Sequence, residues 1–147
     1  MRKFERVEYA PEDTVLPTRA TNNSAGYDFY SPEDFVIKPH GIYKFKTGVR
    51  VYMPNDEVLL INVRSSIGIR KNLVLLNTQG IIDSDFAFST DDNAGNIMVG
   101  LRNLSDVPVE IKKGERVVQG IFVKYQITDD DKPLSDIRTG GVGSSGK

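Results

Sequence analysis

The sequence has no cysteine, no tryptophan and only one histidine in 147 residues. Without cysteine, the protein cannot form disulfides, thiolate nucleophiles, iron–sulfur clusters or cysteine-ligated zinc sites. The single histidine, His40, stands in Lys-Pro-His-Gly and is interpreted as a solvated turn residue, because a histidine-rich metal site needs several such residues. If the protein is an enzyme, carboxylates, arginines and main-chain amides must therefore carry its chemistry.

The sequence also lacks a strong charge of either sign and any long apolar run. Its 19 Lys and Arg face 20 Asp and Glu, a net charge of −1, which argues against a duplex-binding surface. No apolar run approaches the ~20 residues needed to cross a bilayer, and the N-terminus has no apolar segment typical of a signal peptide. We therefore predict a cytoplasmic protein without nucleic-acid or membrane partners.

Alternation of apolar and polar residues predicts mostly β-structure. Residues 43–53 alternate along their whole length. A short helix is expected after Arg64, with a serine as its N-cap. Many short strands in a chain of single-domain length, roughly 100–200 residues, indicate an all-β barrel or double-sheet sandwich. Further strands are predicted at residues 57–63, 73–76, 107–112 and 117–125.

The end of the chain differs in composition from the rest. Residues 129–133 break the strand pattern, and the last eight residues contain four glycines. Such a segment buries too little apolar area to offset the entropy of ordering it. We predict a single β domain over residues 1–128, followed by a flexible linker and glycine-rich lid over residues 129–147. Composition leaves two interpretations of the lid open: a frayed terminus, or glycine and serine amides that wrap a phosphate.

Five short segments contain residues suited to phosphate chemistry. They are Ala25-Gly26-Tyr27-Asp28, Arg64-Ser65-Ser66, Gly80-Ile81-Ile82-Asp83-Ser84-Asp85-Phe86, Gly114-Glu115-Arg116-Val117-Val118-Gln119, and Arg138 through Gly146. Each segment alone is a weak signal, but in this order and spacing the sequence resembles the trimeric dUTPase family from about residue 19 to its end. The resemblance implies a distorted jelly-roll fold and a homotrimer, in which each C-terminal tail crosses to close a neighbour's site.

The resemblance also implies a reaction. In that reaction dUTP and water give dUMP and pyrophosphate, with Mg²⁺ held by the triphosphate of the substrate and by water rather than by protein ligands. Asp83 matches the catalytic aspartate that activates the water attacking the α-phosphorus. A carboxylate suffices for this role because positioning and charge neutralisation do most of the work in phosphoryl transfer. Asp28 matches an aspartate that supports the site and its water network.

The remaining matches divide by the part of the substrate that they would contact. In a uracil pocket, rigid main-chain groups read the base edge and a close wall excludes the methyl group of thymine. The residues that match phosphate-contacting positions are Arg64, Ser65, Ser66, Gln119, Arg138, Ser144 and Ser145. The residues that match the uracil and deoxyribose pocket, a β-hairpin in the family, are Asn77, Ile81, Ile82, Phe86 and Met98.

Three positions depart from the family pattern. Phe86 stands where the family has a tyrosine that packs on deoxyribose. Residues 87–93 form an insertion, which makes Phe88 a second candidate for that ring. Val142 stands where a phenylalanine stacks over uracil, and we expect the loss of that stack to weaken lid closure by ~1–3 kcal/mol.

Two alternative functions use the same kinds of residues. A dCTP deaminase shares the fold and an Arg-Ser-Ser segment, but it needs a glutamate where Gly100 stands in this chain. A nucleotide-gated regulatory module would bind a protein partner, with the acidic residues 91–93 as a candidate docking loop. The presence of Asp83 together with the phosphate-binding matches favours catalysis over both.

Overall fold

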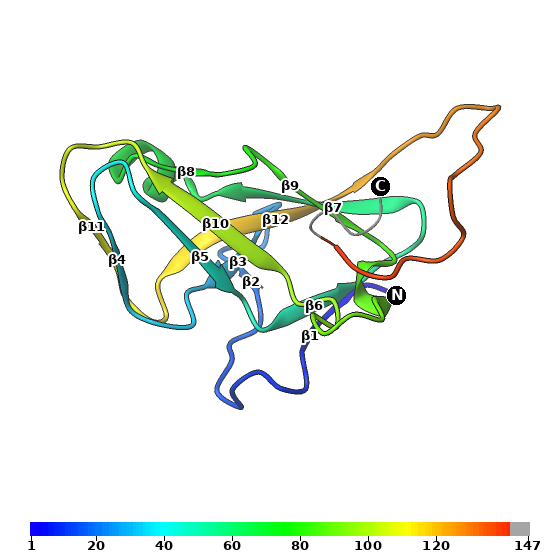
Figure 1. The fold of residues 1–147 in the computed structure, drawn as a ribbon, viewed down its shortest axis with the longest axis horizontal. Coiled ribbons are helices and arrows are strands. Elements are labelled where there is room, and N and C mark those ends of the chain that lie inside the picture. Colours follow the sequence, from blue (N-terminus) through cyan, green and yellow to red (C-terminus); the bar gives the residue numbers. More distant parts are fainter. Residues whose placement is uncertain (142–147) are drawn as a thin grey trace.

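The computed structural model describes residues 1–141, which form an almost entirely β fold (Figure 1). This confirms the all-β class expected from the sequence. Within the described residues, no helix has the length and apolar content that spanning a membrane requires. The strands are β1 (Lys3–Arg6), β2 (Thr18–Arg19), β3 (Tyr27–Tyr30), β4 (Phe35–Ile37), β5 (Ile42–Lys46), β6 (Val49–Tyr52), β7 (Glu57–Val63), β8 (Leu73–Leu75), β9 (Gly80–Asp83), β10 (Met98–Asn103), β11 (Val109–Ile111) and β12 (Arg116–Lys124), with single helical turns η1 (Ser66–Arg70) and η2 (Phe86–Phe88).

The strands pair into two main sheets, and all of their pairings are antiparallel. The larger sheet has the order β2-β3-β12-β7-β9, and a three-stranded sheet has the order β5-β10-β8. Two short ribbons, β1-β6 and β11-β4, lie at the margins. Because β12 lies between β3 and β7, strands distant in sequence become neighbours, as in jelly-roll-like double sheets.

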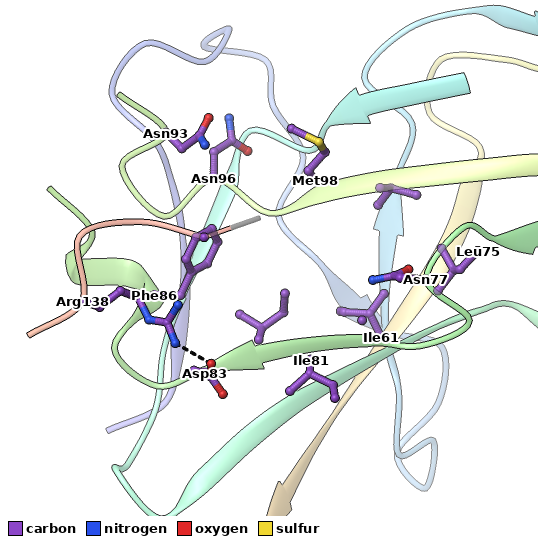
Figure 2. A pocket seen from close by; sticks show the side chains of 14 residues that line it. Ile61, Leu75, Asn77, Ile81, Asp83, Phe86, Asn93, Asn96, Met98 and Arg138 are labelled. Atoms are coloured by element: carbon purple, nitrogen blue, oxygen red, sulfur yellow. Dashed lines mark hydrogen bonds and ion pairs between the residues drawn. The ribbon is translucent and has the colours of Figure 1, made fainter. Parts of the chain in front are cut away.

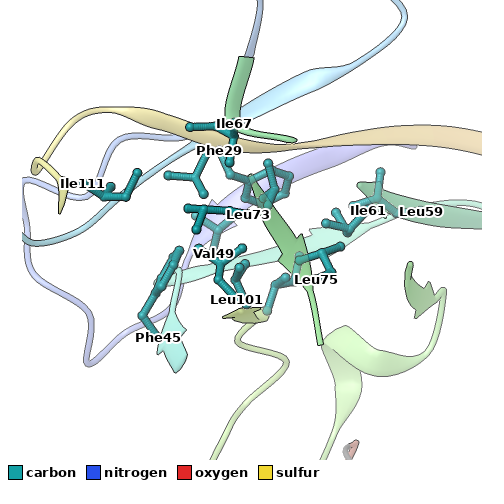
Figure 3. Packing of buried hydrophobic residues seen from close by; sticks show 14 of the residues in the cluster. Phe29, Phe45, Val49, Leu59, Ile61, Ile67, Leu73, Leu75, Leu101 and Ile111 are labelled. Atoms are coloured by element: carbon teal, nitrogen blue, oxygen red, sulfur yellow. The ribbon is translucent and has the colours of Figure 1, made fainter. Parts of the chain in front are cut away.

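A single hydrophobic core fills the space between the two sheets (Figure 3). The three-stranded sheet contributes Leu73 and Leu101, which are fully buried. The larger sheet contributes Phe29 and Leu59 from β3 and β7. Since burying one such side chain stabilises the fold by about 1.5–3 kcal/mol, this core makes the sheets a rigid support for side chains at their edges.

The strand predicted over residues 43–53 is two strands. The chain bends at Gly48, whose φ of +78° suits glycine, and the Gly48 N–H donates to Asn96 Oδ1 at 2.8 Å. As a result β5 pairs with β10 whereas β6 pairs with β1. The alternation of apolar residues did not reveal the break because Phe45 and Val49, on either side of it, both pack into the one core.

The helix expected after Arg64 is the single π-turn η1. Ser65 occupies its N-cap position, but the Ser65 side chain makes no capping hydrogen bond. The main chain closes the turn instead, since the N–H groups of Ile67 and Gly68 donate to Arg64 O at 3.0 and 2.9 Å. The Ser65 hydroxyl is therefore not used in capping and remains exposed.

Candidate active site

A cavity of about 240 Å³ opens beside β9 and β10 (Figure 2). Asp83 lies at its rim, where β9 ends. The other walls come from β10, the turn after β8 and the loop before β10. All five residues expected from the sequence at a uracil and deoxyribose pocket line it: Asn77, Ile81, Ile82, Phe86 and Met98.

The predicted β-hairpin around this cavity is a turn between sheets. Its two arms do not pair with each other, because β8 pairs with β10 whereas β9 pairs with β7. The connecting turn contains Thr78 at a φ of +62°, and the Leu76 N–H donates to Gly100 O at 2.9 Å. The turn thus connects the two sheets, and residues from both sheets line the cavity.

The insertion of residues 87–93 sends its aromatic ring away from the cavity. Phe88 packs edge-on against Tyr52 of β6, with ring centroids 5.5 Å apart. Phe86 is buried and lines the cavity wall. Of the two rings considered for the deoxyribose position, Phe86 is therefore the one at the cavity.

Two asparagines at this cavity were not recognised in the sequence. Asn93 and Asn96 line the wall before β10. Asn96 is buried and donates from Nδ2 to Tyr9 Oη at 3.2 Å, while Tyr9 donates to the main-chain oxygen of Asn93 at 2.9 Å. The N-terminal segment therefore braces this loop. No local pattern indicates such a contact, because Tyr9 and Asn96 are 87 residues apart.

Asp83 has an arginine partner from the tail. Arg138 Nη2 donates to Asp83 Oδ2 at 2.5 Å, and Arg138 Nε donates to Asp85 Oδ1 at 2.5 Å. The side chain of Arg138 is 15% exposed, whereas those of the two carboxylates are about half exposed. The described part of the tail thus returns to β9 of its own chain (Figure 1).

A second cavity of about 540 Å³ lies between β3, β12 and the turn η1. Gln119 reaches it from β12, where its Oε1 lies so close to Gly26 that a β-carbon there would approach to 2.2 Å. A β-carbon at Gly26 would also lie 3.1 Å from Gln119 Cβ, so a larger residue there would displace the Gln119 side chain. Arg70 also lines the cavity and was not recognised in the sequence. The predicted residues at this cavity are Asp28, Arg64, Ser65, Ser66 and Gln119.

Asp28 holds two arginines at this second cavity. Its carboxylate is buried, and it lies 3.2 Å from Arg116 Nη1 and 3.5 Å from Arg64 Nε. Arg64 Nη1 also donates to Arg116 O at 3.2 Å. Two cations against one buried anion leave this edge positive, which suits a polyanionic ligand. Arg116 belongs to the Gly-Glu-Arg segment already singled out, so the sequence contained a signal for it.

The two cavities share no lining residue within the described part of the chain. Asp83 is opposite Val58, whereas Gln119 is opposite Asn62 on the same strand, β7. With a rise of ~3.3 Å per residue and ~4.8 Å between strands, these two sites are roughly 16 Å apart. Ser144, Ser145 and Val142 lie outside the described residues.

Comparison with known proteins identifies the family. The dUTPase family model matches residues 12–146 of the chain. The chain belongs to the dUTPase family. It is 41% identical over 148 residues to the deoxyuridine 5′-triphosphate nucleotidohydrolase of Lactococcus lactis, an alignment that covers 99% of this chain and 98% of that protein. The family assignment makes this dUTPase a hydrolase.

Solved structures of dUTPases have the same fold. The Streptococcus mutans dUTPase has a TM-score of 0.77 and 38% identity, covering 86% of this chain and 98% of that one. The dUTPase of Staphylococcus bacteriophage 80alpha, solved with dUPNHPP, has a TM-score of 0.71 at 23% identity and covers 100% of this chain and 99% of that one. At that identity the phage protein shares the fold alone. The distorted jelly-roll architecture of this dUTPase is therefore that of its family.

Proposed function

We propose that this dUTPase hydrolyses dUTP to dUMP and pyrophosphate, with Asp83 as the general base. The supporting observation is the position of Asp83 at the rim of the cavity lined by Asn77 and Phe86. A nucleoside seated there would place its α-phosphate beside the carboxylate. Asp83 takes a proton from water as the water oxygen bonds to the α-phosphorus, and the bond to the bridging oxygen of the leaving pyrophosphate breaks.

We further propose that the complete site forms in a homotrimer with exchanged tails. The support is the roughly 16 Å between Asp83 and Gln119 in one chain, a distance based on strand spacing. A single chain cannot place its own arginine-rich cavity around the phosphates of a nucleotide in its own first cavity. Arg64, Ser65, Ser66 and Gln119 of a neighbouring chain would therefore grip the phosphates, and Arg138, Ser144 and Ser145 of a tail would add contacts.

Magnesium is proposed to enter as part of the substrate. Within residues 1–141, no three carboxylate or histidine side chains lie close enough together to hold a metal ion. The second cavity has Arg64 and Arg70 in its wall, and such cations suit phosphates rather than a bare metal ion. The arginines would bind a triphosphate that carries its own Mg²⁺ ion. That ion would neutralise part of the phosphate charge.

The test is pyrophosphate release from dUTP by the purified protein, with and without EDTA. We expect turnover with Mg²⁺ and strong loss with EDTA, and absence of pyrophosphate from dUTP would contradict the proposal. dCTP is the control substrate: release of ammonia or dUTP from it would instead support a deaminase. Light scattering that reports a monomer would contradict the trimer.

A further inference from the structure

The tail is attached to three parts of its own chain. Arg138 contacts Asp83 and Asp85, as described above. Thr139 O accepts hydrogen bonds from the N–H groups of Thr90 and Asp91, at 3.0 and 2.9 Å. The third attachment is a close main-chain contact with the cavity wall, because a β-carbon at Gly141 would lie only 2.6 Å from Phe86 Cε1.

The insertion supplies the second of these attachments. Thr90 and Asp91 belong to residues 87–93, the segment that departs from the family pattern. Residues 125–137 are exposed along their whole length, and the chain becomes partly buried again only at Arg138 (Figure 1). Tyr125 hydrogen-bonds to the main chain of residues 55 and 56, and the tail contacts the body of the fold again at residues 138–141.

The first attachment blocks the residue that the reaction needs. The hydrogen bond from Arg138 Nη2 occupies Asp83 Oδ2, an oxygen that would otherwise be able to accept a proton from water. Figure 2 shows the Arg138 guanidinium directed at the Asp83 carboxylate, and the Arg138 side chain is only 15% exposed in this position. Asp83 Oδ2 can accept a proton from water only after Arg138 moves.

We propose that residues 138–141 form a resting latch within each chain, and that the triphosphate of the nucleotide opens it. Asp85 and the main chain of residues 90–91 hold Arg138 on Asp83 when no nucleotide is bound. The substrate offers Arg138 phosphate oxygens in place of two carboxylates, which frees Asp83 and releases the tail to cross to a neighbouring chain. Asp85 is thus a positioning residue. The proposal rests on the proposed function for the roles of Asp83 and Arg138.

Cross-linking tests the latch directly, because the native chain has no cysteine. The variant Thr90→Cys/Thr139→Cys places two thiols where the insertion meets the tail. A short bis-maleimide should bridge them within one chain in nucleotide-free trimers, as intact-mass spectrometry would show. The control Thr90→Cys/Leu134→Cys has its second thiol in the exposed linker and should bridge poorly. The latch would be overturned if the bridge joined two chains, or if the one-chain yield were no higher than that of the control pair.

Ligands then test how the latch opens. A non-hydrolysable dUTP analogue with Mg²⁺ should suppress the one-chain product, whereas deoxyuridine, which has no phosphates, should leave it. If the yield of the one-chain product is the same with the analogue as without ligand, the triphosphate does not draw Arg138 away from Asp83, and this part of the proposal is wrong. None of these measurements requires turnover. An intact latch in a protein that releases no pyrophosphate would therefore refute the proposed function, whereas turnover without a latch would refute this inference.

The role of Asp85 is tested by charge-matched variants of the cysteine pair. Asp85→Asn should lower the one-chain yield by about two- to fivefold, the factor that an exposed ion pair contributes. Asp92→Asn removes the same charge from the insertion at a residue for which no hydrogen bond or ion pair to residues 138–141 is seen, and it should not change the yield. Asp85→Glu keeps a carboxylate and should restore the yield. An unchanged yield with Asp85→Asn would remove Asp85 from this role.

Discussion

Asp28 and Asp83 are both aspartates of short sequence motifs, and both pair with arginine, but their surroundings differ. The Asp28 side chain is 8% exposed, and its partners Arg64 and Arg116 belong to the body of the fold. The Asp83 side chain is 50% exposed, and its arginine comes from the tail. One carboxylate is therefore paired within the sheets, whereas the other is paired with the tail that follows β12.

This difference indicates what each carboxylate can do. A buried ion pair contributes little net stability, but removing one partner is costly because the other charge stays buried without compensation. An exposed pair is worth only about 0–1 kcal/mol, so it can be broken and replaced at little cost. Asp28 is therefore suited to holding arginines in place, and Asp83 to exchanging arginine for water and substrate.

The largest effect is expected at Asp83. Replacing it in Asp83→Asn should lower kcat by about 10²- to 10⁴-fold, the usual contribution of a general base. Binding of a non-hydrolysable dUTP analogue should be retained, and stability toward urea should change little because the side chain is half exposed. Steady-state kinetics and calorimetric titration would check this, and near wild-type turnover would contradict the assigned role.

Asp28→Ala should, in contrast, lower the stability of the fold. Loss of the buried carboxylate leaves Arg64 and Arg116 facing each other, and we expect a decrease of about 2–3 kcal/mol in the free energy of unfolding. Urea denaturation measures this, with Asp83→Ala as the matched control at an exposed site. The comparison fails if both variants are destabilised equally.

Ending the chain after Ile137 should affect function but not folding. This truncation removes Arg138 and the glycine-rich lid, so kcat/KM for dUTP should fall about tenfold or more, the loss expected for one charged hydrogen bond. The urea midpoint should change little, because the ion pairs lost are those with the half-exposed Asp83 and Asp85, and such exposed pairs contribute only about 0–1 kcal/mol. Unchanged kinetics would show that the lid has no role.

A third pair, Glu5 and Arg50, tests the comparison at intermediate exposure, with side chains 33% and 17% exposed. Hydrogen bonds from Arg50 and Lys3 lower the pKa of Glu5 to about 2. Because this pKa lies below the value of ~4.3 for an unfolded chain, the stabilisation is complete above that pH and is lost as pH falls toward about 2.

The corresponding variant is Arg50→Gln, which should have the smallest effect. It should lower the thermal midpoint slightly at pH 7, and its difference from the wild type should shrink below about pH 4, where Glu5 of the unfolded chain takes up a proton. Calorimetry across this pH range checks the sign. A difference that grows as the pH falls would contradict it.

Much of the fold and many of the residues that line the two cavities could be predicted from local sequence. The strands β7 and β12 were predicted from apolar residues in alternating or continuous runs. These patterns mark strands that are buried on one face or on both. The break at Gly48 was missed because both halves of the predicted strand pack into the same core. Residue type and motif spacing identified Asp83 and Arg138, but not that they contact each other.

By itself, the sequence determined the all-β class, the motifs and the kinds of side chain available for chemistry, because these depend on residues within a few positions of one another. Only the tertiary structure decided how they are grouped. It separates the matched residues into two cavities because β9 and β3 lie at opposite sides of β7 and β12. It also joins Arg138 to Asp83, 55 residues away, because the path of the chain after β12 returns the tail to β9.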